Sequence, residues 1–234
     1  MIRGIIFDFD GLILETEGPV YQSWQEVFQE HNCRLELSAW AKILGSAQGA
    51  YDPFDDLERQ LGHPVERKRL EATRRARELE LIAQEMVLPG VRDYLEKAQE
   101  NGLKLAIASS SDRRWVVGHL ERLGLLSYFD CIRTADDVEQ TKPDPELYRQ
   151  ALECLGLTPE EAIVFEDSPH GITAAREAGL FCIAVPNGIS RQLSVDHADL
   201  HLESMADQNL EELLDHIEGM RDKRSQNLPE GKTE

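Results

Sequence analysis

The feature that most constrains the fold is a regular alternation of short apolar runs and glycine-terminated helical segments from residue 88 onwards. Short apolar runs predict buried strands, and a Gly after a helically spaced segment is typical of a helix C-terminus. Strands are expected at residues 2–7, 103–109, 131–135, 162–165 and 181–185. Helices are expected at residues 91–102, 112–124, 145–156, 169–179 and 207–220. Strands that alternate with helices make βαβ units, so we predict an α/β fold with a doubly wound parallel sheet.

An all-helical block, residues 18–86, interrupts this pattern. We expect four helices in it, which begin at Pro19, Ser38, Phe54 and Pro64. A helical block inside an α/β chain is typical of an inserted domain. The expected parts are a core domain, a helical domain and a polar, disordered tail, formed by residues 1–17 with 87–221, by 18–86 and by 222–234. The expected hinge points are Gly18-Pro19 and Pro89-Gly90.

Composition and charge exclude several classes of protein. The chain has 234 residues, of which 41% are hydrophobic, too many for a disordered protein. Its 25 Lys and Arg against 44 Asp and Glu give a net charge of −19, which disfavours binding to nucleic acids and anionic membranes. No apolar run approaches the roughly 18 residues of a membrane span, and the apolar N-terminal run is too short for a signal peptide. We therefore expect a cytoplasmic protein, with a monomer as the default.

The four cysteines predict neither a disulfide framework nor a metal cluster. Cys33, Cys131, Cys154 and Cys182 are scattered and form no C-x-x-C motif. Each lies in an apolar or amphipathic run, so we expect reduced and mostly buried thiols.

Acidic, hydroxyl and basic residues follow the predicted strands at the points where those strands end. They are Asp8, Asp10, Ser109, Lys142, Glu166 and Asp167. The carboxyl ends of parallel strands meet at one edge of a sheet, and ligands bind there near the point where the strand order reverses. We therefore expect these side chains, far apart in sequence, to meet in one crevice.

The two aspartates after the first strand favour phosphoryl transfer. Positions i and i+2 of a strand point the same way, so the carboxylates of Asp8 and Asp10 repel each other unless a cation or a shared task keeps them together. In phosphoryl transfer one carboxylate can attack phosphorus while the other manages the proton of the leaving oxygen. The alternative is a turn in which the aspartates accept backbone hydrogen bonds.

A hydroxyl and a cation follow later strands. Ser109 can donate to a phosphoryl oxygen, although Ser110 and Ser111 compete for that role and a helix cap is the alternative. Lys142 lies beside two prolines that stiffen the backbone, which suits a positioned cation. The alternative for Lys142 is a solvated loop lysine.

An acidic pair, Glu166 and Asp167, ends another apolar strand. Such a pair is costly to bury unless it is solvated or binds a cation. Carboxylate oxygens of this kind suit Mg²⁺, and the alternative is a cap for the helix that follows.

These residues resemble the four ordered motifs of the haloacid dehalogenase (HAD) superfamily. The matching segments are Asp8-Phe9-Asp10-Gly11, Ser109, Lys142-Pro143 and Glu166-Asp167-Ser168. The resemblance covers about residues 1–220, and the helical block has the size and place of the cap in the β-phosphoglucomutase-like phosphatases. It implies a Rossmann-like HAD core with an inserted all-helical cap.

The resemblance also implies a mechanism for hydrolysis of a small phosphorylated metabolite, with a sugar phosphate as one candidate. Asp8 would be the nucleophile that forms an aspartyl-phosphate. Asp10 would protonate the leaving oxygen and then activate water. Ser109, with its neighbour Ser110, and Lys142 would hold the transferring phosphoryl group.

The cofactor implied by the resemblance is Mg²⁺. Its ligands would be the Asp8 carboxylate, the Asp10 backbone carbonyl and Asp167, with Glu166 nearby. Together with Lys142, the ion would supply the local positive charge that an acidic protein needs to handle phosphate.

The residues leave two other functions open. Related phosphomutases carry a His where this chain has Val20, and a cap Arg in the loop that corresponds to residues 45–49, which has none. A non-catalytic phosphate- or partner-binding protein would keep the fold without turnover. Asp10 argues against a dehalogenase, since those relatives lack this second Asp. Glu15 stands where the family usually has Asp.

Two basic segments are interpreted as surface features. The arginines between residues 67 and 77 interleave with glutamates at i,i+4 spacing, which predicts a solvated, self-paired helix face. Arg113-Arg114-Trp115 follows Ser109 and is interpreted as helix surface, with an approach to an anionic substrate as the alternative.

Overall fold

A computed structural model of the chain describes residues 1–44 and 51–226. Within them, six strands form one parallel sheet in the order β3-β2-β1-β4-β5-β6. The strands are β1 (Gly4–Phe7), β2 (Lys104–Ala108), β3 (Cys131–Arg133), β4 (Ala162–Glu166), β5 (Phe181–Ala184) and β6 (Leu200–His201). This is the order of a doubly wound Rossmann-like sheet, as predicted. Strand β6 was not predicted because Leu200 is only partly buried, His201 is exposed, and the two residues form no apolar run.

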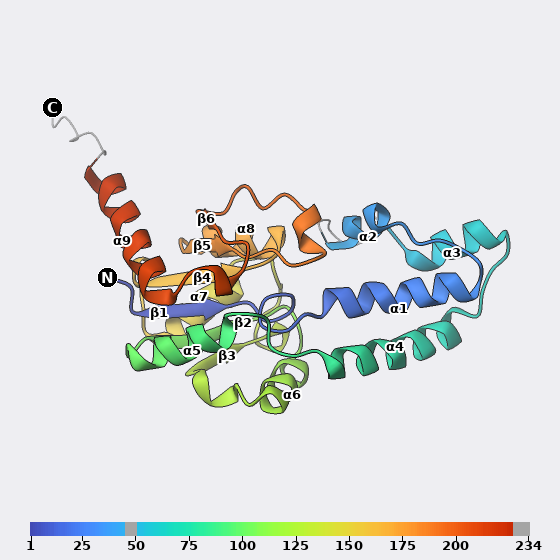
Figure 1. Cartoon of the computed structure of the whole chain (residues 1–234), viewed down its shortest axis with the longest axis horizontal. Helices are drawn as coiled ribbons and strands as arrows, with labels where there is room; N and C mark the ends of the chain where they lie inside the picture. Colours follow the sequence, from blue (N-terminus) through green and yellow to red (C-terminus); the bar gives the residue numbers. More distant parts are fainter. Residues whose placement is uncertain (45–50, 227–234) are drawn as a thin grey trace.

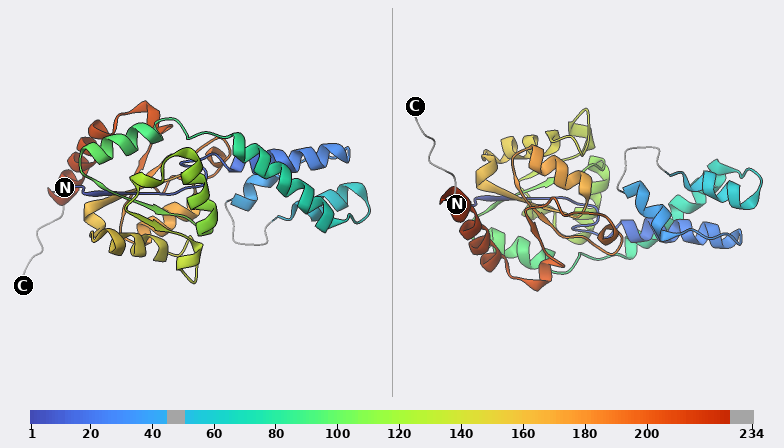
Figure 2. Two further views of the ribbon diagram at one scale, coloured as in Figure 1. Left: turned by 90° about the horizontal axis from the view of Figure 1, so that it is seen from below. Right: turned by 90° about the horizontal axis from the view of Figure 1, so that it is seen from above.

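Helices cover both faces of the sheet (Figures 1 and 2). One face packs against α5 (Val91–Glu100), α6 (Arg113–Leu123) and α9 (Leu210–Gln226), and the other against α7 (Glu146–Leu155) and α8 (Pro169–Glu177). Side chains of β1 alternate between the two layers, with Ile5 and Phe7 on one side and Ile6 on the other. Burial on both faces explains why the strands are continuous apolar runs. None of the helices in the described ranges is long and apolar enough to cross a membrane.

The predicted helices of the core are close to the observed ones. Asp112 caps α6 by accepting from Trp115 N, and Gly124 and Gly156 end α6 and α7 in the left-handed conformation. Helix α9 differs, since it begins three residues later than expected and extends to Gln226, into the segment expected to be a disordered tail. The rest of that segment, residues 227–234, lies outside the described residues.

The inserted block forms a separate helical body beyond the carboxyl edge of the sheet (Figure 1). It contains α1 (Glu17–Glu30), α2 (Leu37–Leu44), α3 (Pro53–Leu61) and α4 (Arg67–Gln84), around a core of Trp24, Phe28, Trp40 and Leu57. Three predicted starts were wrong. Helix α1 begins at Glu17 rather than Pro19. Ser38 lies inside α2 rather than capping it, and α4 begins at Arg67 rather than Pro64, because Val65 N is held by Glu58 Oε1 of the preceding helix at 3.0 Å.

Two adjacent linkers join the helical body to the core. Leu14 and Val87 form an antiparallel bridge, and Leu88 N donates to Ile13 O at 2.9 Å. The chain therefore passes between the core and the helical body at residues 15–16 and 85–86. Of the expected hinge points, Gly18-Pro19 lies in the first turn of α1, and Pro89-Gly90 lies on the core side of the second linker. Glu15 Oε1 accepts from Gly18 N at 2.9 Å, which caps the first turn of α1.

The prediction of four reduced, mostly buried cysteines was wrong. Cys131 of β3 and Cys154 of α7 form a disulfide, with Cα atoms 6.3 Å apart and a sequence separation of 23. Helix α7 lies across β3, so packing brings together two thiols that no local spacing connects, and Cys154 is exposed. Cys33 is half-buried and Cys182 is buried, and both are free thiols.

Candidate active site

The candidate site lies where the strand order reverses, between β1 and β4. A cavity of about 480 Å³ opens there, between the carboxyl edge of the sheet and the helical body. Its lining includes five of the predicted residues together with Ser110, namely Asp8, Asp10, Ser109, Ser110, Lys142 and Asp167. The sixth, Glu166, is fully buried behind Lys142. The end of a buried strand thus positions each acidic group, as the sequence pattern predicted.

Lys142 connects the nucleophile candidate to the acidic pair. Its Nζ contacts Asp8 Oδ1 and lies 2.6 Å from Glu166 Oε1, and its side chain is only 5% exposed. Burial acts to lower the pKa of Lys142, but the carboxylates of Asp8 and Glu166 outweigh it and raise that pKa above its usual value. Lys142 is therefore a fixed cation at the cavity wall, and the solvated alternative does not hold.

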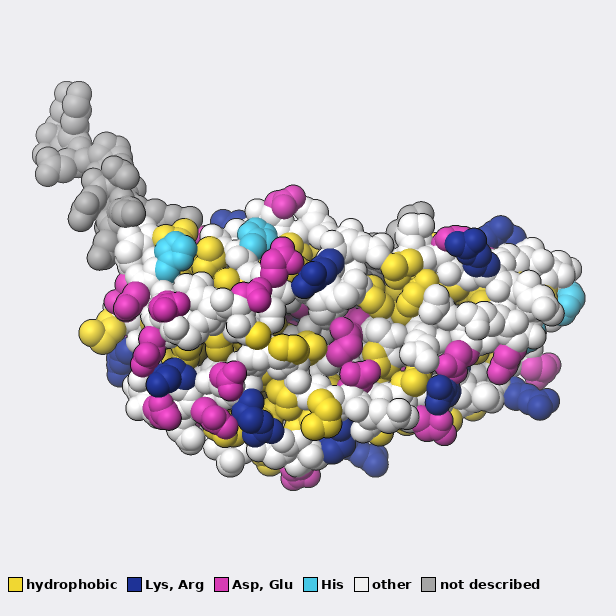
Figure 3. Space-filling model, in the orientation of Figure 1, with side chains coloured by type: hydrophobic (Ala, Val, Ile, Leu, Met, Phe, Trp, Pro, Cys, Tyr) yellow, Lys and Arg dark blue, Asp and Glu magenta, His cyan; other side chains and the backbone are white. Residues whose placement is uncertain are grey.

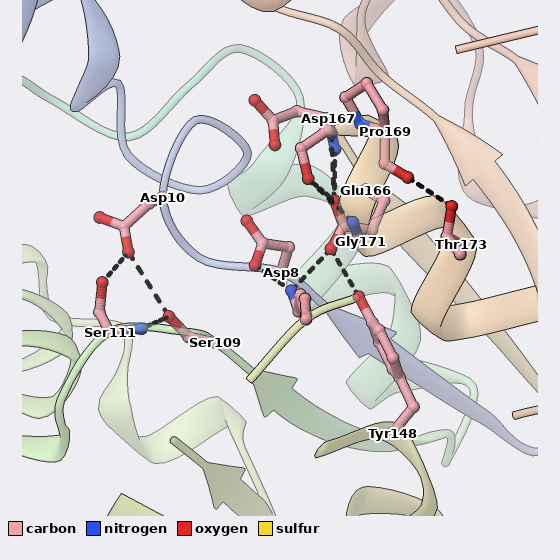
Figure 4. A network of polar contacts seen from close by, with 12 residues as sticks. Asp8, Asp10, Ser109, Ser111, Tyr148, Glu166, Asp167, Pro169, Gly171 and Thr173 are labelled. Atoms are coloured by element: carbon pink, nitrogen blue, oxygen red, sulfur yellow. Dashed lines mark hydrogen bonds and ion pairs between the residues drawn. The ribbon is translucent and has the colours of Figure 1, made fainter. Parts of the chain in front are cut away.

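Glu166 is held by several donors of the protein (Figure 4). Tyr148 OH donates to its Oε1 at 2.7 Å, and Ser168 Oγ donates to its Oε2 at 3.0 Å. A Cβ on Gly171 would lie 1.7 Å from Glu166 Oε1, so only Gly allows α8 to approach this closely. Sequence reasoning gave Tyr148 no role, although it follows Lys142 by six residues on the next helix. Both oxygens of Glu166 accept hydrogen bonds from protein donors, and Oε1 also binds Lys142 Nζ, so Glu166 fixes the position of Lys142.

The acidic cluster fits a divalent cation. Asp8, Glu166 and Asp167 are buried and offer oxygens that all lie within 4.8 Å of one another. Burial raises the pKa of Asp8 to about 7 even though Lys142 acts to lower it, and burial together with Asp8 and Glu166 raises the pKa of Asp167 well above its usual value. Repulsion among buried carboxylates of this kind is relieved by a hard cation with oxygen ligands, such as Mg²⁺.

Asp10 is turned away from Asp8 (Figure 4). Its Oδ2 accepts from Ser111 Oγ at 2.6 Å and from Ser109 Oγ at 3.4 Å, and its Oδ1 accepts from Trp115 Nε1 at 2.9 Å. The interpretation of Trp115 as helix surface was therefore wrong. Trp115 lies in the first turn of α6, and no local spacing in the sequence relates it to Asp10.

The serine run contributes a wall of the cavity. Ser109 is almost fully buried, and its Oγ accepts from Ser111 N at 3.1 Å, whereas Ser110 is exposed. All three serines line the cavity. The hydroxyl of Ser111, which sequence reasoning left as a competitor, is the one that binds Asp10 most closely.

The helical body supplies the opposite wall. Glu17 and Val20 of α1 and Arg75, Glu78 and Ile82 of α4 line the cavity. Burial and the carboxylate of Asp10 raise the pKa of Glu17 to about 8. The guanidinium of Arg75 lies over the Trp115 ring, 5.3 Å from its centroid, and pairs with Glu78.

The prediction of a self-paired α4 was right for Arg74 and Glu78, but the prediction that this face is solvated was wrong. Arg74 and Glu78 are buried, and both Arg74 and Arg75 pair with Glu78. Arg67 pairs with Asp55 and Glu58 of α3 and with Asp52, which caps that helix, rather than with Glu71. The i,i+4 spacing showed that α4 can pair with itself, but not which face packs against α1 and the cavity.

Sequence comparison places this site in a known family. Residues 5–185 match the family of Haloacid dehalogenase-like hydrolases, and the chain belongs to it. The chain is 48% identical over 217 residues to YhcW of Bacillus subtilis, a protein named as a phosphatase, with 93% of this chain and 98% of that protein covered. It is 33% identical over 181 residues to the Phosphorylated carbohydrates phosphatase of Thermotoga maritima, with 76% and 82% covered.

A solved structure agrees with the fold. The β-phosphoglucomutase of Clostridium difficile superposes with a TM-score of 0.69 at 23% identity, covering 94% of this chain and 99% of that one. The protein is thus a HAD phosphatase of the β-phosphoglucomutase-like subgroup, a phosphoric monoester hydrolase with an α/β core and an inserted helical cap.

Proposed function

We propose that the protein is a Mg²⁺-dependent phosphatase that hydrolyses a small phosphorylated metabolite, a sugar phosphate, through an aspartyl-phosphate on Asp8. The observation that carries this proposal is the bridge of Lys142 between Asp8 and Glu166 at the strand-order reversal. It supports a nucleophilic role for Asp8, because this carboxylate lies beside a buried cation at the wall of one cavity. Residues 1–17 and 87–221 form the catalytic core in this proposal, and residues 18–86 form the cap.

Asp8 attacks phosphorus, and the bond between phosphorus and the leaving alcohol breaks as the alcohol oxygen takes a proton from Asp10. Asp10 then takes a proton from the water that attacks the aspartyl-phosphate, which releases phosphate and restores the Asp8 carboxylate. The hydrogen bonds from Ser109, Ser111 and Trp115 keep the Asp10 carboxylate at the cavity wall between these steps. Mg²⁺, when held by Asp8, Asp167 and the Asp10 carbonyl, would neutralise charge on the phosphoryl oxygens.

Phosphoryl oxygens need donors on the core side of the cavity. Lys142 supplies a charge-assisted donor, and Ser109 and Ser110 supply hydroxyls that line the same cavity. Because catalysis of phosphoryl transfer consists mainly of positioning and charge neutralisation, these groups are sufficient on the protein side.

The cap wall favours a polyhydroxylated leaving group. Glu17 offers carboxyl oxygens and Arg75 offers guanidinium donors, and both residues line the same cavity. Groups of this kind hydrogen-bond sugar hydroxyls. The name of the Thermotoga maritima relative, Phosphorylated carbohydrates phosphatase, supports this substrate class.

Hydrolysis is favoured over phosphomutase activity by a residue of α1. Val20 lines the cavity at the position where related mutases carry His. An apolar side chain there cannot move a proton for an intermediate held between two phosphorylations.

The test is phosphate release with Mg²⁺ across a panel of phosphorylated metabolites. We expect release from sugar phosphates by the wild type and its loss in Asp8→Asn. Asp215→Asn is the matched control, because Asp215 is exposed on α9, away from the cavity. Unchanged release in Asp8→Asn would overturn the mechanism. Isomerisation of a sugar 1-phosphate with little free phosphate would show the mutase instead.

A further inference from the structure

The loop after β5 contains a buried side chain to which no catalytic role has been given. Asn187 is 9% exposed, and its Nδ2 donates to Gly11 O at 2.7 Å and to Asp167 Oδ2 at 3.0 Å. Its Oδ1 accepts from Ile189 N at 3.1 Å and Ser190 N at 3.3 Å. A side-chain amide has two donor hydrogens and two acceptor lone pairs, so Asn187 uses its full capacity.

The two donor contacts reach two different parts of the candidate metal site. Asp167 belongs to the acidic cluster, and Gly11 directly follows Asp10. Gly11 has φ +80°, and a Cβ on it would lie 2.4 Å from Asp167 Oδ2 and 2.6 Å from Asn187 Nδ2. The three segments are therefore packed without space between them. A change at Asn187 is felt by both Asp167 and the turn that carries Asp10.

The same loop is also fixed on its other side, by the cap. Ile189 is buried and belongs to the hydrophobic core of the helical body, with Trp24, Phe28 and Trp40. The turn that follows it, η4 (Ser190–Gln192), lies beside α2 (Figure 1). Asn187 thus contacts the acidic cluster, and Ile189, two positions further along the chain, contacts the core of the cap.

We propose that Asn187 is a positioning residue for the divalent-cation site. It holds the Asp167 carboxylate directly and, through Gly11 O, the turn that carries the Asp10 carbonyl, while Ile189 fixes its loop against the cap. The proposal rests on the cation expected at the acidic cluster and adds a residue that the proposed mechanism does not use. A neutral donor suits this role, because it orients Asp167 without supplying the positive charge that the cation must supply. Partners of this outer kind typically change metal affinity by about 10- to 100-fold when removed.

A purely structural role must be separated from this one. The Oδ1 contacts to Ile189 N and Ser190 N form a local turn that stabilises the loop in any case. Asn187→Ser keeps a side-chain oxygen that can accept from amides two and three residues on, but it is too short to reach Asp167 and Gly11. Asn187→Ala removes both sets of contacts.

The experiment measures Mg²⁺ affinity by titration calorimetry on the full chain, without substrate. We expect Asn187→Ser to fold with nearly wild-type thermal stability and to bind Mg²⁺ about 10- to 100-fold more weakly. Asn187→Ala should lose at least as much affinity and also some stability. Asn209→Ala is the control, because Asn209 Oδ1 accepts from Glu212 N at 2.9 Å at the start of α9, away from the cavity. Its Mg²⁺ affinity should equal that of the wild type.

The outcomes separate this inference from the proposed function. Wild-type Mg²⁺ affinity in a folded Asn187→Ser overturns the positioning role, whatever the enzyme hydrolyses. Failure of the wild type to hydrolyse any phosphomonoester overturns the proposed function, while the calorimetric comparison still stands. Ile189→Ala should weaken Mg²⁺ binding less than Asn187→Ser does, and unchanged affinity in Ile189→Ala would remove the link to the cap.

Discussion

At the scale of single residues, the site depends on one buried cation that serves two carboxylates. Lys142 contacts Asp8 and Glu166, yet Asp8 and Asp167 still have raised pKa values. The protein therefore does not fully compensate its own acidic cluster. A bound divalent cation would supply the missing positive charge, and the cation together with Lys142 would then attract a phosphoryl group.

The metal-free protein should lose stability as the pH rises through the range set by Asp8. Burial raises the pKa of Asp8 from 3.8 to about 7. In the unfolded chain this carboxyl loses its proton near pH 4, so between about pH 4 and 7 the folded state holds a proton that the unfolded state has lost. The free energy of unfolding then decreases with increasing pH. We expect the thermal midpoint without metal to fall across this window.

Asp8→Asn tests whether the pH dependence of stability originates from Asp8, because an amide does not titrate. The pH slope of the thermal midpoint should be smaller in Asp8→Asn than in the wild type, whereas Asp215→Asn should keep the wild-type slope. Mg²⁺ requires the charged carboxylate, so it should raise the midpoint more at pH 8 than at pH 6. An equally steep slope in Asp8→Asn would assign the pH dependence to other groups.

At the scale of elements, the site depends on how closely α8 approaches the end of β4. Gly171→Ala would place a methyl group 1.7 Å from Glu166 Oε1, and Glu166 would have to leave Lys142. We expect the variant to lose most phosphate release and about 1–3 kcal/mol of unfolding free energy, as for other overpacked cores. Activity assays and denaturant titration measure the two effects.

Gly118→Ala is the matched control for that substitution. Gly118 lies inside α6, and a Cβ on it would meet no atom within 4 Å. Ala in a helix is favoured over Gly by about 0.5–1 kcal/mol, so this variant should be more stable and fully active. Equal losses in both variants would mean that the approach of α8 to Glu166 is not the cause.

Helix α4 provides a prediction for substrate binding. Buried Glu78 holds Arg74 and Arg75, and Arg75 faces the cavity. Glu78→Gln should release Arg75 and raise KM for the preferred sugar phosphate about tenfold, with kcat changed much less, because a hydrogen bond to a charged group contributes about 1.5–3 kcal/mol. Glu80→Gln is the control, since Glu80 pairs with Arg77 on the same helix outside the cavity. A fall in kcat at constant KM would contradict a role in binding.

The elements that the sequence predicted best are those that local pattern determines. The buried strands are apolar runs, and Gly124 and Gly156 mark helix ends, so the sheet and the placement of Asp8, Lys142 and Asp167 followed. Asp8 and Asp167 directly follow β1 and β4, and Lys142 lies in the loop between β3 and α7.

The parts that the sequence did not predict depend on packing between segments distant in the chain. Trp115 reaches Asp10, and Asn187 reaches Asp167, through the way loops meet at the sheet edge. The Cys131–Cys154 disulfide arises in the same way, from α7 crossing β3. Neither residue type nor spacing marks such contacts in a single sequence.

At the scale of the whole molecule, the charge of the protein opposes the charge of its substrate. The net charge is −19, and the face shown in Figure 3 mixes acidic and basic side chains without a broad basic area. The cavity is itself rich in carboxylates, and Lys142 and Arg75 are its Lys and Arg residues among the described part of the chain. A phosphate monoester therefore approaches against a repulsive long-range field and meets attraction only at short range.

Ionic strength changes the balance between the long-range repulsion and the short-range attraction. The Debye length is roughly 30 Å at 0.01 M salt and about 8 Å at 0.15 M, so salt screens the distant acidic surface far more than a cation in contact with the phosphoryl group. We expect kcat/KM for a sugar phosphate at saturating Mg²⁺ to rise a few-fold from low to physiological salt, with kcat nearly constant. A neutral salt such as NaCl, at fixed pH and Mg²⁺, provides the series. If kcat/KM instead falls steadily with salt, the local cations of the site dominate the approach of substrate, and the net charge of the molecule has no part in its kinetics.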